Sequence, residues 1–205
     1  MPSHHPILLL DVMNTLVYDP FYVEVPAFFG LSLDELLHQK HPTAWLEFEI
    51  DSSDEAAFLP RFFSDGRDVD GEGLKAMMKR AYRWLDGMED LLRDLRRAAV
   101  EMHALSNYPV WYRMIESRLQ LSRFMSWRFV SCKTAVRKPD PEAYLGAAQA
   151  LGVPLSRCLF VDDRAKNCEA AQAVGMASIV FTDAPTLRAE LAARGCLLSS
   201  PRASS

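Results

Sequence analysis

Four short, continuous apolar runs are spaced along the chain, at residues 7–10, 100–105, 158–161 and 177–181. Such runs are typical of strands that are buried on both faces of a parallel sheet. Helical patterns lie between them, at residues 89–99, 141–151 and 164–174, and Gly152 and Gly175 close two of these. Because strands alternate with helices, we predict right-handed crossovers and an α/β fold built on a doubly wound parallel sheet.

The stretch at residues 18–85 breaks this alternation. It contains no strand-like apolar run, only amphipathic segments such as 32–38 and 43–50, and it is rich in aromatic residues. We therefore expect a small α-helical cap inserted after the first strand. The predicted organisation is a core formed by residues 1–17 and 86–205 and a cap formed by residues 18–85.

The composition excludes several classes of protein. Hydrophobic residues make up 49% and charged residues 24%, as in an ordinary soluble globular protein, and a net charge of −4 offers no basic surface for nucleic acid or an anionic membrane. No apolar run approaches the roughly 18 residues of a membrane-spanning helix. The cysteines are far apart, which favours reduced thiols in an intracellular compartment over zinc ligation or disulfides; they are Cys132, Cys158, Cys168 and Cys196.

Polar residues stand at the ends of the predicted strands. In open α/β sheets, ligands bind beyond the carboxyl ends of the strands. The side chains expected at this rim are those of Asp11, Ser106, Asn107, Asp162 and Asp163, with Lys138 from a loop. Clustered carboxylates repel one another unless a cation neutralises them, and Mg²⁺ suits oxygen ligands while keeping waters that a phosphate can replace. The pattern therefore predicts magnesium-dependent attack of a carboxylate on a phosphate ester.

Four segments carry a family resemblance: LLLDVMNTL, HALSN, RKPDPEAY and LFVDDRAKN. Taken in this order, with a helical insertion after the first, they resemble the motifs of haloacid dehalogenase superfamily hydrolases. The resemblance spans nearly the whole chain. It implies a Mg²⁺-dependent phosphatase that forms an aspartyl phosphate.

The resemblance implies a role for each residue of the rim. Asp11 would be the nucleophile, and Lys138 would orient it and balance its charge. The phosphoryl oxygens would be held by Thr15, Ser106 and the Asn107 amide. The magnesium ligands would be the side chains of Asp11, Asp162 and Asp163 and the backbone carbonyl of Met13.

One position departs from the phosphatase pattern. Phosphatases of the superfamily usually carry a second Asp two residues after the nucleophile, as general acid and base, and this chain has Met13 there. A thioether cannot donate a proton to a leaving alkoxide, and general acid–base help is worth about 10²- to 10⁴-fold. Residues of the predicted cap could supply the proton, and the candidates are Tyr18, Asp19, His38 and His41.

The departure leaves two other interpretations open. A non-hydrolytic binding or regulatory module would keep the fold and the metal site after losing the acid. A phosphonatase-type C–P hydrolase also lacks the second Asp. It would need a lysine of the cap for imine formation, and Lys40 is a candidate, although lysines in polar segments usually stay hydrated.

The extended strings DVMNTLVYDPFY, VPAFFG, KHPTAW and SNYPVWY are similar to a plant and algal branch of the superfamily that includes a chloroplast flavin mononucleotide (FMN) hydrolase. The resemblance implies FMN as the substrate, with riboflavin and phosphate as products.

The same resemblance implies the chloroplast, whereas residues 1–6 leave no room for a transit peptide before the first apolar run, so a cytoplasmic location is the alternative. The sequence does not give an oligomeric state.

Aromatic residues of the cap are candidates for stacking on a flavin ring: Phe28, Phe29, Trp45 and Phe63. General burial preferences predict that most of them form the cap's own core.

Overall fold

The computed structural model describes residues 5–197; the ends at 1–4 and 198–205, including those parts of the predicted core, lie outside the described residues. Five parallel strands form one sheet in the order β3-β2-β1-β4-β5. They are β1 (Ile7–Leu10), β2 (Met102–Ser106), β3 (Ser126–Val130), β4 (Cys158–Asp162) and β5 (Ala177–Val180). The predicted doubly wound parallel sheet is confirmed, and each predicted run forms a strand.

Strand β3 is the one strand that the apolar runs did not predict. It lies at an edge of the sheet, where Ser126 and Arg128 are exposed while Trp127 and Phe129 are buried. The exposed polar residues interrupt the apolar run that marks the central strands. Alternating polarity over residues 126–130 is the pattern that indicates this strand.

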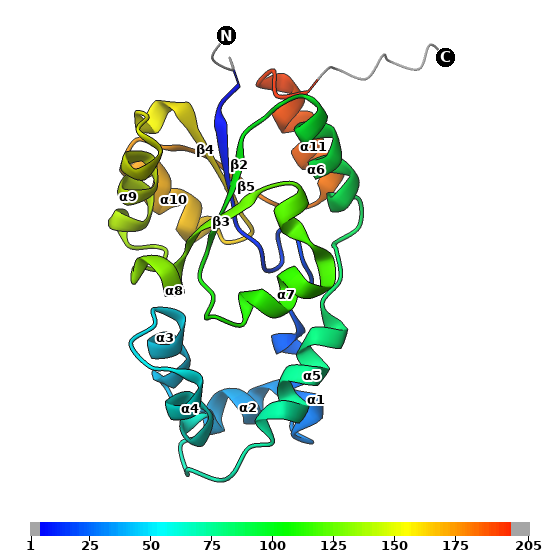
Figure 1. Cartoon of the computed structure of the whole chain (residues 1–205), viewed down its shortest axis with the longest axis vertical. Helices are drawn as coiled ribbons and strands as arrows, with labels where there is room; N and C mark the ends of the chain where they lie inside the picture. Colours follow the sequence, from blue (N-terminus) through cyan, green and yellow to red (C-terminus); the bar gives the residue numbers. More distant parts are fainter. Residues whose placement is uncertain (1–4, 198–205) are drawn as a thin grey trace.

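Helices cover both faces of the sheet (Figure 1). One face carries α9 (Pro141–Leu151) and α10 (Ala165–Ala173), and the other carries α6 (Met88–Arg97), α7 (Tyr112–Leu119) and α11 (Ala184–Ala193). Shorter turns connect the elements: η1 (Pro20–Tyr22), η2 (Leu59–Arg61), η3 (Leu121–Arg123), α8 (Ser131–Thr134) and η4 (Leu155–Arg157).

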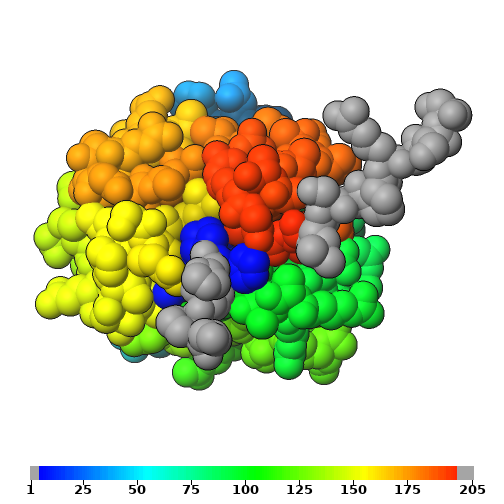
Figure 2. Space-filling view, turned by 90° about the horizontal axis from the view of Figure 1, so that it is seen from above, coloured from blue at the N-terminus to red at the C-terminus, as the bar shows by residue number. Residues whose placement is uncertain are grey.

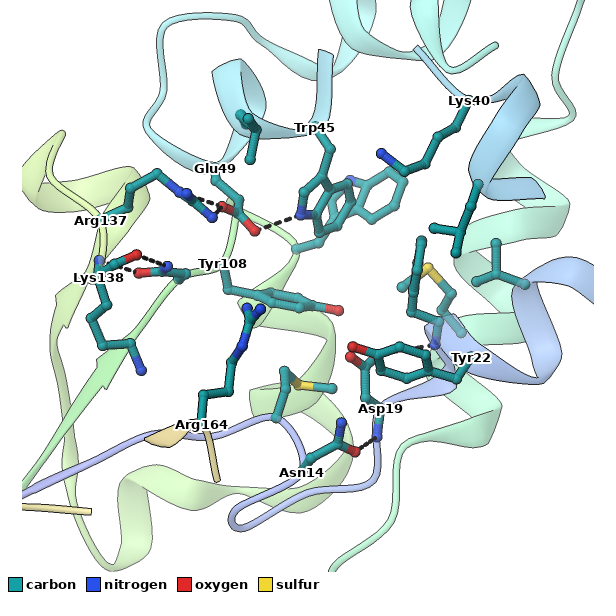
Figure 3. Close-up of a pocket in the computed structure, with 18 of the residues that line it drawn as sticks. Asn14, Asp19, Tyr22, Lys40, Trp45, Glu49, Tyr108, Arg137, Lys138 and Arg164 are labelled. Atoms are coloured by element: carbon teal, nitrogen blue, oxygen red, sulfur yellow. Dashed lines mark hydrogen bonds and ion pairs between the residues drawn. The ribbon is translucent and has the colours of Figure 1, made fainter. Parts of the chain in front are cut away.

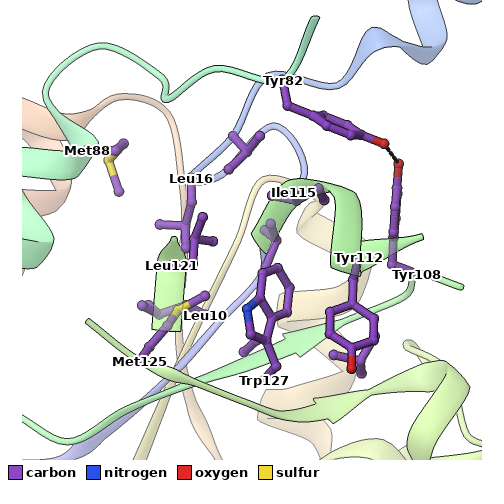
Figure 4. Close-up of a cluster of buried hydrophobic side chains, with 14 of the residues drawn as sticks. Leu10, Leu16, Tyr82, Met88, Tyr108, Tyr112, Ile115, Leu121, Met125 and Trp127 are labelled. Carbon is purple, nitrogen blue, oxygen red and sulfur yellow. Dashed lines mark hydrogen bonds between the residues drawn. The ribbon is translucent and has the colours of Figure 1, made fainter. Parts of the chain in front are cut away.

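Strand β1 lies at the centre of the core. Successive side chains of a strand point to opposite faces, so Leu9 packs with the cluster under α9 and α10, while Leu8 and Leu10 pack with the larger cluster on the other face. Figure 4 shows Leu10 in that larger cluster, near Trp127. In Figure 2 the start of β1, in blue, lies between segments that cover the two faces of the sheet. This burial on both faces explains why residues 7–10 are uniformly apolar.

Between β1 and β2 the chain forms a helical insertion, which the sequence analysis places at residues 18–85. Its helices are α1 (Glu24–Phe28), α2 (Leu33–Gln39), α3 (Ala44–Glu49), α4 (Glu55–Phe58) and α5 (Gly71–Ala81). They lie beyond the carboxyl ends of the strands (Figure 1). Val17 pairs with Trp84 where the chain enters and leaves the insertion. The helical character agrees with the sequence analysis, whereas the domain boundaries themselves stay a prediction.

The insertion has an aromatic core of its own. The rings of Phe48 and Phe58 stack with centroids 4.7 Å apart, and Phe63 is 3% exposed. The hydroxyls of Tyr82, just after α5, and Tyr108, after β2, lie 2.7 Å apart and join the insertion to the core (Figure 4). Within residues 5–197, no helix is long and apolar enough to cross a membrane. The four cysteines are free, in agreement with the expected thiols.

Candidate active site

Asp11 follows β1 directly and stands at the carboxyl edge of the sheet. Its backbone N–H donates to the carbonyl of Val161 in the neighbouring strand at 2.9 Å. Its side chain is buried; Oδ1 accepts from Lys138 Nζ at 2.7 Å and Oδ2 accepts from Thr15 Oγ1 at 3.2 Å. Burial raises the pKa of Asp11 to about 7, against the opposing charge of Lys138. Both carboxylate oxygens are therefore held in place by hydrogen-bond donors.

Lys138 reaches Asp11 from the loop before α9. The side chain of Asn107 accepts from the Lys138 backbone N–H and donates to its carbonyl, both at 2.8 Å, and so fixes this loop. The ammonium is 2% exposed and also donates to Asp162 Oδ2 at 2.5 Å. Burial lowers the pKa of Lys138, but the two carboxylates outweigh it and raise the pKa above its ordinary value. The lysine is therefore charged between two carboxylates.

Asp162 ends β4 and is fully buried. Its oxygens accept from Asn167 Nδ2 at 3.0 Å, and Oδ1 also accepts from the backbone N–H of Arg164 at 2.8 Å. The sequence analysis assigned no role to Asn167, which lies on α10 and is 6% exposed. It stands five residues after Asp162 in the segment LFVDDRAKN, and the start of α10 brings its amide to the end of β4.

Three carboxylates meet at this edge. Asp11, Asp162 and Asp163 each offer an oxygen, and these oxygens lie within 4.8 Å of one another. Burial and the charge of Asp162 raise the pKa of Asp163. An all-oxygen set of this spacing and charge fits a hard divalent cation such as Mg²⁺.

The three predicted phosphate-binding residues differ in the hydrogen bonds that their side chains make. Ser106 ends β2 and is 2% exposed, and its Oγ is the buried side-chain polar atom that lacks a hydrogen-bond partner within residues 5–197. An unpaired buried hydroxyl costs about 1–3 kcal/mol, so this group suits a bound anion. Thr15, in contrast, donates to Asp11 and accepts from the Asp163 N–H at 3.1 Å. The side-chain contacts of Thr15 and Asn107 are positioning contacts, and their phosphate-binding roles stay predictions.

The edge of the sheet opens into a cavity of about 460 Å³ that extends to the helices of the insertion (Figure 3). Asp11, Lys138 and Asp163 line its core side, and Trp45 and Lys40 line the insertion side. The side chain of Lys40 points toward the cavity in Figure 3.

The predicted stacking candidates fall into two groups, one residue at the cavity and three in the hydrophobic core. Trp45 lines the cavity, whereas Phe28, Phe29 and Phe63 pack with the hydrophobic cluster and are not among the residues that line it. Phe29 contacts Phe63 with ring centroids 4.9 Å apart. The expectation that most of these rings form the insertion's own core is confirmed for these three.

The loop after Asp11 carries Met13, whose side chain lines the cavity where a second carboxylate would stand. Asn14 in this loop has a φ of 56°, a left-handed conformation that Asn tolerates better than most residues. Its Oδ1 accepts from the backbone N–H of Asp19 at 3.3 Å, which ties Asp19 to the Met13 loop (Figure 3).

Two of the four proton-donor candidates line the cavity, namely Asp19 and His41. The hydroxyl of Tyr18 donates to Glu24 at 2.8 Å, and His38 is exposed. Burial raises the pKa of Asp19 to about 6. Within this set, Asp19 is the carboxyl group that is tied to the loop of the missing acid.

A buried ion pair joins the insertion to the loop of Lys138. Glu49, at the end of α3, is 6% exposed; it accepts from Arg137 Nε at 3.0 Å and forms an ion pair with Arg137 Nη2 at 3.0 Å (Figure 3). It also accepts from the indole N–H of Trp45 at 2.5 Å, and its carbonyl accepts from Ser131 Oγ at 2.6 Å. Burial raises the pKa of Glu49, and Arg137 opposes this. The sequence analysis missed this pair, because residues 88 positions apart leave no local pattern.

The comparison with protein families shows to which family this chain belongs. Residues 31–175 match haloacid dehalogenase-like hydrolases. The chain belongs to the haloacid dehalogenase-like hydrolase family. The resemblance and the hydrolase class predicted from the four motifs are confirmed.

This hydrolase is 48% identical over 197 residues to flavin mononucleotide hydrolase 1, chloroplastic, of Arabidopsis thaliana, a match that covers 96% of this chain and 80% of the relative. It is 31% identical over 97 residues to a phosphoglycolate phosphatase of Pseudomonas savastanoi pv. phaseolicola, covering 47% of this chain and 36% of the relative.

Solved structures of the family share the fold. A HAD family enzyme of Bacteroides thetaiotaomicron, in a magnesium complex, has a TM-score of 0.72 at 18% identity, covering 88% of this chain and 95% of that one. The L-2-haloacid dehalogenase of Xanthobacter autotrophicus has a TM-score of 0.62 at 16% identity, covering 92% and 83%.

Proposed function

We propose that this hydrolase is a Mg²⁺-dependent phosphatase that cleaves FMN to riboflavin and phosphate. The observation that carries the proposal is the position of Asp11, which lies between the Lys138 ammonium and the carboxylate cluster at the base of a cavity of about 460 Å³. A cavity of this size suits a small organic substrate. The Arabidopsis hydrolase, at 48% identity, supports FMN as that substrate.

In the proposed reaction, an oxygen of Asp11 attacks phosphorus. The new O–P bond forms an aspartyl phosphate while the ester P–O bond breaks and the riboflavin hydroxyl leaves. Water then attacks phosphorus, which releases phosphate and restores Asp11. Lys138 and Thr15 hold the two carboxylate oxygens, so the nucleophile is oriented before the substrate arrives.

The residues present fit a metal ion. Asp11, Asp162, Asp163 and the backbone carbonyl of Met13 would hold Mg²⁺, as the oxygen cluster within 4.8 Å supports. When bound, the ion supplies positive charge that offsets the carboxylates and stabilises the transferring phosphoryl group. The buried, unpaired hydroxyl of Ser106 would donate to a phosphoryl oxygen.

We propose Asp19 as the proton donor that replaces the acid missing at Met13. Its carboxyl group lines the cavity, it is tied through Asn14 to the Met13 loop, and its pKa is raised to about 6 by burial. A carboxyl group with that pKa is partly protonated near neutral pH, which suits protonation of the leaving alkoxide.

A second candidate function is C–P hydrolysis, which the position of Lys40 beside the cavity favours. A phosphonatase would form an imine between this lysine and a carbonyl substrate. Borohydride reduction with phosphonoacetaldehyde, followed by mass spectrometry, tests for that adduct on Lys40.

The test of the proposed function is phosphate release from FMN, sugar phosphates, nucleotides and a phosphonate, with and without Mg²⁺. We expect FMN to be the best substrate, with Mg²⁺-dependent turnover that Asp11→Asn abolishes, and an aspartyl phosphate in the wild-type chain. A folded chain that releases phosphate from none of these substrates contradicts the proposal and favours the non-hydrolytic module.

We also propose a chloroplast location, which the chloroplastic Arabidopsis relative supports. Fluorescence of a tagged full-length protein in plant or algal cells tests it, and a cytoplasmic signal contradicts it.

A further inference from the structure

We infer that Trp45 recognises the planar ring of the substrate, and that the Glu49–Arg137 ion pair holds the indole in the orientation this requires. The inference rests on the proposed function for the identity of the ring, an isoalloxazine. The juxtaposition that motivates it is an indole at the cavity wall whose N–H is bound to a buried carboxylate.

The indole is packed by its neighbours without a parallel partner. Four rings contact it with centroids 5.6–6.1 Å away and planes inclined by 67–80°, those of Phe48, Phe58, Tyr108 and Trp111. Within residues 5–197 no ring is stacked parallel on it. Trp45 is half-buried, and it lines the cavity. An offset stack is the aromatic geometry that none of these four protein rings makes with the indole, so a substrate ring in the cavity would add a contact of a different kind.

The orientation of Trp45 is fixed before the substrate binds. Its N–H donates to Glu49 at 2.5 Å, and Glu49 is in turn held by both guanidinium contacts from Arg137. Binding to a side chain that is already ordered costs little further conformational entropy. The ion pair is therefore a positioning device for the indole.

The same ion pair connects the two ends of the cavity. Arg137 precedes Lys138, whose ammonium contacts the nucleophile, while Glu49 belongs to the insertion. The phosphate would lie at Asp11 and the ring at Trp45, with the ribityl chain between them. This arrangement explains why a carboxylate of the insertion is buried against the core.

Tyr22 is the rival for ring recognition, because it also lines the cavity. It is 51% exposed, and its ring meets Phe21 edge-on at 5.4 Å. A side chain this exposed loses more freedom when it stacks, so the fixed indole is the better platform. The experiment therefore compares the two positions.

The experiment measures riboflavin binding by quenching of its fluorescence, which reads the ring without any hydrolysis. We expect Trp45→Leu to weaken binding about tenfold and Trp45→Phe to weaken it less, in line with the loss of a base–aromatic stack. Trp84→Phe is the matched control outside the cavity and leaves binding unchanged, and Tyr22→Leu changes it less than twofold. Wild-type affinity in Trp45→Leu, or a larger loss in Tyr22→Leu, overturns the inference.

A second comparison tests the positioning role of Glu49. Glu49→Ala weakens riboflavin binding, whereas Glu49→Gln, which keeps an acceptor for the indole, restores most of it; circular dichroism verifies that both variants fold. Equal binding by wild type and a folded Glu49→Ala variant, or no rescue by a folded Glu49→Gln variant, overturns this role.

Hydrolysis then separates the inference from the proposed function. For Trp45→Leu, the KM for FMN rises, and the loss in kcat/KM is larger for FMN than for glycerol phosphate, which has no ring. Trp45-dependent riboflavin binding in a chain that does not hydrolyse FMN refutes the proposed function and leaves the inference standing. FMN hydrolysis with Trp45-independent riboflavin binding refutes the inference alone.

Discussion

The ammonium of Lys138 lies 2.7 Å from the carboxylate of Asp11, although the two residues are 127 positions apart in the chain. The same ammonium lies 2.5 Å from Asp162. One buried cation therefore offsets the charge of two buried carboxylates.

Replacing Lys138 by Met removes the cation while keeping an unbranched side chain. We expect kcat/KM to fall at least about 1,000-fold, because the nucleophile loses its orientation and charge balance. The free energy of unfolding at pH 8 falls by about 3 kcal/mol, since two buried carboxylates lose their partner. Lys166→Met, at an exposed lysine, is the control. Denaturation and turnover measurements that find the two variants alike argue against a role for Lys138.

We expect Mg²⁺ to raise the melting temperature of the wild-type chain. A ligand at 100 times its dissociation constant stabilises the folded state by about 2.7 kcal/mol, which shifts the melting temperature by several degrees in a chain of this size. We expect Asp163→Asn to lose most of this shift and the exposed control Asp65→Asn to keep it. Differential scanning fluorimetry with Mg²⁺ and with EDTA measures it, and an equal shift in both variants counts against the carboxylate cluster as the metal site.

We expect activity toward FMN to depend on the protonation of Asp19. Burial raises the pKa of this carboxyl group to about 6, so its acidic form is depleted as the pH rises above that value. We expect kcat/KM for FMN to fall on this limb, and Asp19→Asn to remove the limb and lower kcat/KM by about 10²- to 10⁴-fold. Hydrolysis of p-nitrophenyl phosphate changes little, because its leaving group needs no proton. An equal loss on both substrates contradicts the acid role.

The raised pKa of Asp19 also makes the free energy of unfolding depend on pH. The folded pKa of Asp19, about 6, lies above its ordinary value of 3.8, so the folded state binds this proton more tightly than the unfolded state. The resulting stabilisation is fully present below about pH 4 and is lost as the pH rises through about 6. Asp19→Asn is therefore more stable than wild type at pH 7 in EDTA and loses that advantage at low pH. Thermal denaturation at both pH values tests the sign.

Ser106→Ala separates stability from phosphate binding. The hydroxyl is buried without a partner, so removing it leaves the free energy of unfolding unchanged or raises it by about 1 kcal/mol. Inhibition by inorganic phosphate weakens about tenfold, because one charge-assisted hydrogen bond is lost. Ser131→Ala is the contrast, since its hydroxyl bonds to backbone groups of Glu49 and Tyr108, and it destabilises the chain. Unchanged phosphate inhibition in Ser106→Ala removes Ser106 from the site.

The residues at the edge of the sheet were predictable for a simple geometric reason. The apolar runs before Asp11, Ser106 and Asp162 mark parallel strands, and parallel strands bring their carboxyl ends to one edge. Strand β3 was missed because exposed Ser126 and Arg128 interrupt its apolar run at the edge of the sheet.

Hydrogen-bond partners were harder to predict from the sequence. Asn167 stands inside a segment that the sequence analysis singled out, yet its two bonds to Asp162 depend on how α10 begins. The sequence also offered several rings of the insertion as stacking candidates, and burial separates them, because Phe63 is 3% exposed while Trp45 lines the cavity.

Short-range patterns thus predicted the strands of the sheet other than β3, the helical insertion, the family and the residue types at the candidate site, because strand burial and motif spacing are visible in consecutive residues. The tertiary structure decided which groups are partners: Lys138 pairs with Asp11, and Glu49 pairs with Arg137. It also left the hydroxyl of Ser106 without a hydrogen-bond partner among residues 5–197. Such pairs join segments far apart in the chain, and their orientation is set by packing of the insertion against the core. A local sequence pattern therefore does not predict these pairs.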